Sequence, residues 1–318
     1  MYNGITLLRC VAAFFIVGCH LQLFPRTAGG AAITSLCDMN VGLFAAISGF
    51  LMVESLDKSG VAVEGYARKR AARLLPGYFF WTAFYLLASL VFSLVMNKAI
   101  DVGKYFSLQF WLDVVLCGGA SCHLWFIASL LYANVLLSVC YSVLRRLRIA
   151  PVVFLAIGLL LVSMATYSRA FMFRYPCRLV GFVSLGMVVK MLHDRIPIRQ
   201  RLSIIFLCVG LGIYVLLGRY VHPFVRSLAV VLPLLIVFAR KELPLYGGRV
   251  VECLAGFSMG VFLFHPFFAA GMAAIIPRIV SPPFGVGVIL SDWLVVYMLA
   301  LMGTMAMMRV PLFERLVK

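Results

Sequence analysis

The sequence is poor in charge. Only 12% of its 318 residues are Asp, Glu, Lys or Arg, and the 11 acidic residues are far outnumbered by the 28 basic ones. A soluble domain carries about 25% charged residues. Hydrophobic residues make up 64% of the chain, and they recur in runs that approach the roughly 20 residues a helix needs to cross a bilayer. These proportions exclude a soluble globular protein and predict an all-α, polytopic membrane protein.

Several signatures of enzymes are also missing. The chain has no HExxH, no CxxC, no paired carboxylates at useful spacing and no glycine-rich phosphate loop, so the sequence predicts no metal site. No small-residue cleavage site ends the first apolar run, and we expect that run to be a span rather than a signal peptide. Most of the 9 cysteines fall within apolar runs. Cys117 and Cys122 share a loop, where a disulfide is weakly supported.

The apolar runs predict about ten transmembrane helices. A further segment, residues 105–116, is amphipathic and is expected to lie at the outer membrane surface. The loops are too short for a separate catalytic domain, so we expect one membrane domain over residues 1–318. The expected spans are residues 5–24, 36–54, 77–96, 122–144, 150–166, 178–192, 203–217, 227–239, 252–276 and 286–308.

The net charge of +17 invites an interpretation as a nucleic-acid-binding protein. The basic residues, however, form short clusters between apolar runs, which is the pattern that sets membrane topology. With the N-terminus in the cytoplasm, basic residues favour the inner side by about two to one. The sequence therefore predicts no nucleic-acid partner, and it predicts that both termini are cytoplasmic.

Two ionisable residues lie inside the first span. Arg9 and His20 are 11 positions apart, which puts them on one helix face with an axial separation of about 16 Å. Either residue could simply reach an interface. Because ionisable groups in spans usually face a bundle interior or a wet cavity, the pair also suggests a polar path.

A basic cluster precedes the third span. Arg68, Lys69, Arg70 and Arg73 lie just before Pro76 and Tyr78. Such a cluster can be a positive-inside anchor. Guanidinium groups also bind phosphate oxygens in pairs, so the same loop could bind a polyphosphate such as a cytosolic nucleotide-like ligand.

Five motifs in order carry a family resemblance. They are the Arg9/His20 pair, Ser48-Gly49-Phe50, the basic entry from Arg70 to Tyr78, HLWFI from His123 to Ile127, and FSMGVFLFHP from Phe257 to Pro266. Together they resemble the acyltransferase-3 family of integral membrane O-acyltransferases, for which a core of ten helices is expected. The HLWFI form lacks a Glu that other members have after the tryptophan motif. The chain is thus more similar to the HLWF-type branch, which includes glycan O-acetyltransferases.

The resemblance implies a reaction and a set of roles. An acyl group, commonly acetyl from acetyl-CoA, would pass from the cytoplasm to a hydroxyl of a glycan or lipid-linked saccharide outside it. His20 would be the general base or a transient acyl carrier, and an imidazole suits both roles because its pKa lies near neutral pH. The basic residues expected to hold the donor are Arg9, Arg68, Lys69, Arg70 and Arg73.

Other polar residues are weaker candidates. Asp38 could orient His20 across the first hairpin, or it could be a helix N-cap. His123, Trp125 and His265 are candidate acceptor contacts, although Trp125 also fits an interfacial belt and His265 a structural role. Ser48 lacks the surroundings of a nucleophile, and we interpret its motif as close helix packing.

We therefore expect an O-acyltransferase of the bacterial cytoplasmic membrane that modifies an envelope or exported saccharide. The alternative is a transporter or flippase of a lipid-linked or polymeric saccharide, because intramembrane Arg and His residues could also bind an anionic passenger. The sequence leaves the oligomeric state open.

Overall fold

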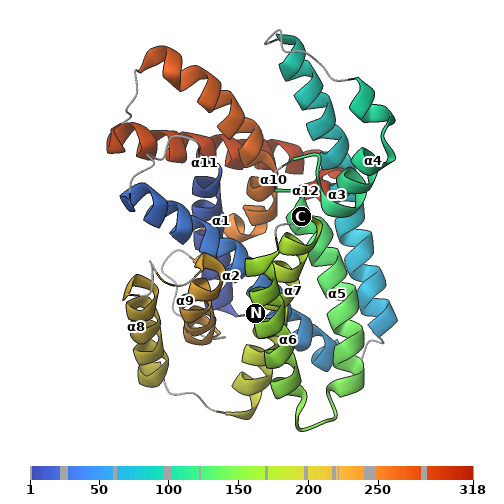
Figure 1. Ribbon diagram of the computed structural model, residues 1–318, viewed down its shortest axis with the longest axis vertical. Coiled ribbons are helices and arrows are strands. Elements are labelled where there is room, and N and C mark those ends of the chain that lie inside the picture. The colour runs from blue at the N-terminus through green and yellow to red at the C-terminus, as the bar shows by residue number, and fades with distance from the viewer. Residues whose placement is uncertain are drawn as a thin grey trace.

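The computed structural model consists of helices throughout its described residues (Figure 1). It describes residues 2–21, 28–59, 63–95, 102–121, 123–168, 171–196, 200–216, 220, 222–239, 248–280 and 285–317.

Each expected span has a corresponding helix. These are α1 (Asn3–Cys19), α2 (Ala28–Ser59), α3 (Val63–Val95), α5 (Trp125–Leu144), α6 (Ala150–Tyr167), α7 (Phe171–Arg195), α8 (Gln200–Leu216), α9 (Pro223–Phe238), α10 (Gly248–Ile279) and α11 (Val286–Met308). Three short elements complete the described chain: the 3₁₀ turn η1 (Gly103–Phe106), α4 (Leu108–Cys117) and α12 (Pro311–Val317). Helix α4 corresponds to the amphipathic segment expected at 105–116.

Seven of these helices contain a stretch that is long and apolar enough to cross a membrane: α2, α3, α5, α6, α7, α10 and α11. The others, α1, α8 and α9, hold shorter apolar stretches of 10–17 residues. Because a typical span has about 20 residues, the role of these three helices as full spans stays a prediction. The all-α, multi-pass membrane architecture is confirmed, while the orientation of the termini is still an expectation.

Small residues bring the central helices together. A Cβ added to Gly49 of α2 would lie 1.9 Å from the carbonyl oxygen of Val183 on α7. A Cβ on Gly186 of α7 would lie equally close, 1.9 Å, to the carbonyl oxygen of Ala46. Helices in membranes pack closely through such glycines. This contact confirms the interpretation of the Ser48-Gly49-Phe50 motif as close helix packing.

The motif that opens the third span anchors two other elements. The Tyr78 hydroxyl donates to the carbonyl oxygens of Val114 and Val115 on α4, at 2.8 and 3.0 Å. The indole of Trp81 donates to the carbonyl oxygen of Leu316 on α12, at 3.2 Å. Helix α3 is therefore the scaffold on which α4 and the last described helix are held.

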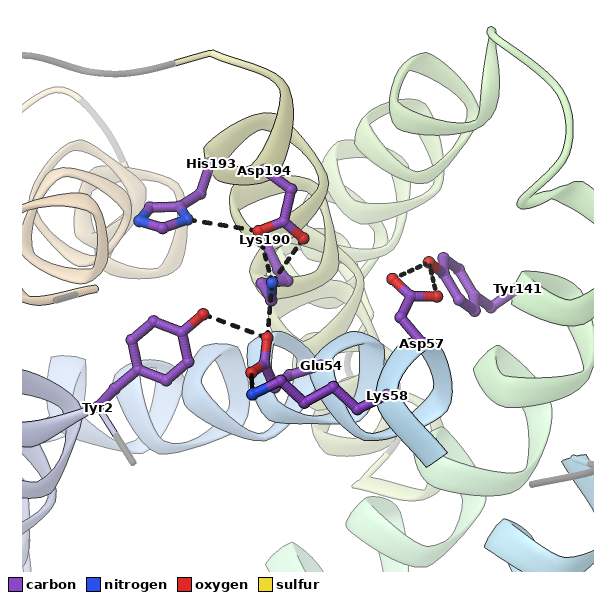
Figure 2. Close-up of polar contacts among 8 residues, drawn as sticks. All are labelled: Tyr2, Glu54, Asp57, Lys58, Tyr141, Lys190, His193 and Asp194. Atoms are coloured by element: carbon purple, nitrogen blue, oxygen red, sulfur yellow. Dashed lines mark hydrogen bonds and ion pairs between the residues drawn. The ribbon is translucent and has the colours of Figure 1, made fainter. Parts of the chain in front are cut away.

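A network of charges ties the start of α1 to α2 and α7 (Figure 2). The Lys190 ammonium lies 2.6 Å from a Glu54 oxygen and 2.5 Å from Asp194. The same carboxylate of Glu54 accepts a 3.1 Å hydrogen bond from the Tyr2 hydroxyl and pairs with Lys58. Lys190 is only 4% exposed, so this network stabilises the meeting of three helices at one end of the bundle.

The cysteine prediction cannot be carried through. Cys117 is buried at the end of α4 and has no disulfide partner among the described residues, which do not include Cys122.

Candidate active site

The predicted donor-binding arginines of two helices meet in one cavity. Arg9 of α1 and Arg70 and Arg73 of α3 line a space of about 130 Å³, here called the arginine cavity. Ser48, Asn134 and Ser258 supply its other polar side chains, and the remaining lining residues are apolar or aromatic. Three cations in a mostly apolar wall attract an anion strongly, because low-dielectric surroundings weaken the screening of their charges.

Neighbouring side chains hold two of these arginines in place. One terminal nitrogen of Arg9 donates to the Ser258 hydroxyl of α10 at 3.2 Å. The Arg70 Nε donates to the Tyr66 hydroxyl at 3.1 Å, and that hydroxyl donates to the Asn134 side-chain oxygen at 2.8 Å. Sequence reasoning missed all three supporting residues. Of the three, only Ser258 could have been found from the sequence, because it lies within the FSMGVFLFHP motif.

The remaining basic residues of the cluster lie apart from this cavity. Arg68 and Lys69 are exposed, and they line none of the described cavities. The structure therefore divides the predicted donor site into three cavity residues and two surface residues.

The three histidines that the sequence singled out form one cluster. The ring centre of His20 lies 4.9 Å from that of His265 and 6.4 Å from that of His123, and the latter two are 5.8 Å apart. His20 directly follows α1, His123 precedes α5, and His265 lies within α10. Tertiary packing thus joins residues that are about 100 and 140 positions apart in the chain.

Two glycines allow the backbone to place His20 and His123 in this cluster. Gly18 lets α1 end against its neighbours, since a Cβ there would lie 2.7 Å from both the Cys37 sulfur and the Trp293 ring. Gly118 has a φ of 71° and ends α4, and a Cβ there would lie 2.3 Å from the Trp125 nitrogen. The left-handed conformation favours glycine, and it turns the chain back toward His123.

The hydrogen bonds of His265 determine its tautomer. Its Nδ1 lies 3.1 Å from the carbonyl oxygen of Val261. A carbonyl can only accept, so Nδ1 carries the hydrogen and Nε2 of the neutral ring is left as an acceptor. The residue is fully buried, and Nε2 has no partner among the described residues. Two residues before His265, the Leu263 carbonyl oxygen accepts a 2.6 Å hydrogen bond from the Tyr85 hydroxyl, which fixes α3 beside the cluster.

His20 opens onto a second, larger cavity. This histidine cavity has a volume of about 700 Å³ and lies between α3, α10 and the chain at Ala120 and Ser121. Its polar side chains are few, with Tyr85, Ser89 and Ser121 the hydroxyl groups among them. Ser121 lies 3.0 Å from the Nδ1 of His123. The cavity is large enough for a substrate, and it presents the imidazole of His20 to it.

The two cavities are separate. They have no lining residue in common, so the expected continuous polar path from Arg9 to His20 is not found within the described residues. Phe262 of α10 lies at the boundary: it lines the arginine cavity, and its ring centre is 5.4 Å from His123 and 6.0 Å from His265. An aromatic ring thus stands where the path was expected.

Asp38 has a different main partner from the one anticipated. Both of its carboxylate oxygens accept hydrogen bonds from Arg178 of α7, at 3.0 and 2.7 Å. Asp38 follows Cys37, which packs against Gly18 at the end of α1, and the proposed influence of Asp38 on the His20 imidazole stays a prediction. Arg178 is 2% exposed, and the sequence did not single it out as a candidate site residue.

Trp125 is placed away from both cavities. It is 7% exposed and packs against Tyr175 of α7, with ring centres 4.6 Å apart and ring planes tilted by 37°. Trp125 lines neither cavity, and its role as an acceptor contact stays a prediction. Among the described residues, no group of three or more His, Cys, Asp or Glu side chains is arranged to hold a metal ion.

Comparison with known proteins identifies the family. The acyltransferase-3 family model, described as an acyltransferase domain, matches residues 2–309. Neither a curated protein nor a solved structure matches the chain. The match covers nearly the whole chain, including α1 with its Arg9 and His20 and α10 with His265. The chain belongs to the acyltransferase-3 family and is a membrane acyltransferase.

Proposed function

We propose that this protein transfers an acetyl group from acetyl-CoA to a hydroxyl of an envelope or exported saccharide, in a bacterial cytoplasmic membrane. The observation that carries the proposal is the pair of adjacent cavities, one lined by three arginines and the other by His20. The first has the chemistry of a phosphate site and the second that of a base beside a substrate space.

The arginine cavity would hold only part of the donor. At about 130 Å³ it fits a phosphate group rather than a whole coenzyme. The nucleotide would then lie outside it, where the exposed Arg68 and Lys69 add positive potential. From this cavity the pantetheine arm could extend past Phe262 toward His20. The Phe262 ring would have to turn aside for the thioester to pass.

His20 would act as the general base. As the acceptor hydroxyl oxygen attacks the thioester carbonyl carbon, the imidazole takes the hydroxyl proton. The tetrahedral intermediate then breaks its carbon–sulfur bond, and the thiolate receives that proton from the imidazolium. The products are the ester and free CoA, so protons and electrons balance. The buried Nε2 acceptor of His265 lies in the same cluster, where it can share a hydrogen bond with the imidazolium.

Membership of an acyltransferase family favours this reaction over the alternative of a saccharide transporter.

The test of the proposed function has two parts. Saccharides of the cell envelope are analysed for base-labile acetyl esters with and without the gene, and the purified protein is tested for binding of acetyl-CoA. We expect loss of a specific ester on deletion and binding of the donor. Intact esters together with no donor binding would overturn the proposal, since a transporter is indifferent to CoA.

A further inference from the structure

We propose that Tyr66 and Asn134 are positioning residues, which together aim the terminal nitrogens of Arg70 at a phosphate group of the donor. This inference rests on the proposed function, because it concerns how the arginine cavity binds acetyl-CoA. The two residues come from different helices, α3 and α5, and they are buried, with 5% and 1% of their surface exposed. Asn134 also lines the arginine cavity itself.

The hydrogen bonds that join these residues run in one direction only. The Asn134 side-chain nitrogen donates to the Leu130 carbonyl oxygen at 2.6 Å, which leaves the amide oxygen of Asn134 for Tyr66. An amide oxygen can only accept, so the Tyr66 hydroxyl donates its single hydrogen to it, at 2.8 Å. The hydroxyl oxygen is then an acceptor for the Arg70 Nε, which lies 3.1 Å away. Asn134 thus orients Tyr66, and Tyr66 orients Arg70.

This contact leaves the end of the Arg70 guanidinium available. The Tyr66 hydroxyl occupies the Nε, and the guanidinium carbon lies 5.2 Å from the centre of the Tyr66 ring. The two terminal nitrogens have no hydrogen-bond partner among the described residues. Such a pair of nitrogens binds two oxygens of one phosphate group. Tyr66 therefore holds Arg70 from the side and keeps its phosphate-binding end unoccupied.

The acceptors that hold the arginines are neutral. Among the described residues that line the arginine cavity there is no Asp or Glu. Arg9 is also held by a hydroxyl, that of Ser258, which donates its own hydrogen to the Ala255 carbonyl oxygen at 2.8 Å and accepts from Arg9. A carboxylate in such a place would offset the positive charge that attracts a phosphate. Neutral acceptors orient the guanidinium groups and leave their charge uncompensated.

The experiment measures acetyl-CoA binding and acyl transfer by the full-length protein in detergent. We expect Tyr66→Phe to weaken acetyl-CoA binding by about tenfold, the effect of one hydrogen bond to a charged group. The KM for acetyl-CoA should rise with little change in kcat at saturating donor. Asn134→Leu should weaken binding to a similar extent, because the Tyr66 hydroxyl then loses the partner that orients it.

A tyrosine elsewhere in the bundle provides the matched control. Tyr141 of α5 is also buried, and its hydroxyl donates to the Asp57 carboxylate at 2.9 Å. It lines neither the arginine cavity nor the histidine cavity. We expect Tyr141→Phe to leave acetyl-CoA binding unchanged, although it also removes a hydrogen bond of a buried tyrosine.

A double-mutant cycle separates positioning from general structural support. If Tyr66 and Asn134 act through Arg70, adding Tyr66→Phe or Asn134→Leu to Arg70→Met should weaken acetyl-CoA binding further by about twofold or less. Unchanged binding by Tyr66→Phe would overturn the inference. So would a loss in the Arg70→Met protein as large as in the parent, because the two residues would then act on the donor directly or through the fold.

An isosteric variant tests the neutrality of the acceptors. Asn134→Asp keeps the shape of the side chain and adds a negative charge beside the arginine cavity. We expect it to weaken acetyl-CoA binding by at least about tenfold, because it offsets part of the positive charge of the cavity. Binding as tight as in the parent would contradict this role. If the parent protein binds acetyl-CoA while these variants behave otherwise than expected, only the positioning inference is wrong; if the parent binds none, the proposed function itself fails.

Discussion

The guanidinium of Arg178 donates to both carboxylate oxygens of Asp38, and its second terminal nitrogen also donates to the Asp38 backbone carbonyl at 2.9 Å. This arrangement joins α7 to α2 near the end of α1, where His20 lies. The Arg178 side chain is 2% exposed and that of Asp38 35%. The ion pair therefore joins α2 and α7, with the arginine buried and the carboxylate partly accessible.

Breaking this pair from one side should destabilise the protein. We expect Asp38→Asn to cost about 2 kcal/mol or more, somewhat below the cost for a fully buried pair because Asp38 is partly exposed. The double variant Asp38→Asn with Arg178→Met should be more stable than Asp38→Asn alone, since no unpaired cation is left buried. Thermal melting in detergent measures both. If Asp38 also orients His20, the double variant should regain stability but still transfer acyl groups slowly. Full recovery of the transfer rate would show that Asp38 has a structural role only.

Replacement of the proposed base should stop the chemistry and spare donor binding. We expect His20→Gln to lower the rate of acyl transfer by about 10²–10⁴-fold, the usual contribution of a general base. Acetyl-CoA binding should be unchanged, because the arginine cavity contains none of the three histidines. Transfer is followed with radiolabelled acetyl-CoA. A His20→Gln protein that is folded and transfers at the parental rate would show that the assignment is wrong.

The two classes of basic residue in the cluster should behave differently. Arg70 lines the arginine cavity, and we expect Arg70→Met to weaken acetyl-CoA binding by about 10- to 100-fold, the range for one hydrogen bond to a charged group. Arg68 is exposed on the same helix, and Arg68→Met should change binding by about threefold or less. Calorimetric titration measures both affinities. Equal effects of the two variants would point to general electrostatic attraction instead of a defined phosphate site.

The Phe262 ring should control passage of the acyl group from the donor to the acceptor. Phe262→Leu removes part of this barrier, and we expect release of CoA without acceptor to increase several-fold as water reaches the thioester. Phe262→Trp enlarges the barrier and should slow transfer while donor binding is kept. The free thiol released from acetyl-CoA is measured in both cases. If neither rate changes in either variant, the acyl group does not pass this residue.

The charge network of Figure 2 predicts an effect on stability alone. Lys190→Met leaves the carboxylates of Glu54 and Asp194 without their shared cation, and Lys58 is then the remaining cation at Glu54. We expect a loss of about 3 kcal/mol, at the low end for a broken buried pair. Adding Glu54→Gln to Lys190→Met should restore part of the lost stability, because one unpaired carboxylate is then neutral. Melting temperatures of the single and double variants test this, and a double variant less stable than Lys190→Met would contradict it.

The sequence by itself determined the membrane class and the positions of the helices, because long apolar runs and short basic clusters are local features. It also determined that Arg9 and His20 share a helix face, since this follows from helical periodicity. Even the family could be inferred from motifs, and the family match over residues 2–309 confirms it.

Only the tertiary structure decided which of these residues meet. It selected Arg70 and Arg73 over Arg68 and Lys69 for the arginine cavity, and it buried Trp125 against Tyr175. It also paired Asp38 with Arg178 and placed Phe262 between the two cavities. These outcomes depend on contacts between helices far apart in the chain. A periodic pattern shows which face of a helix is polar, but the residues opposite that face are set by how the whole bundle packs.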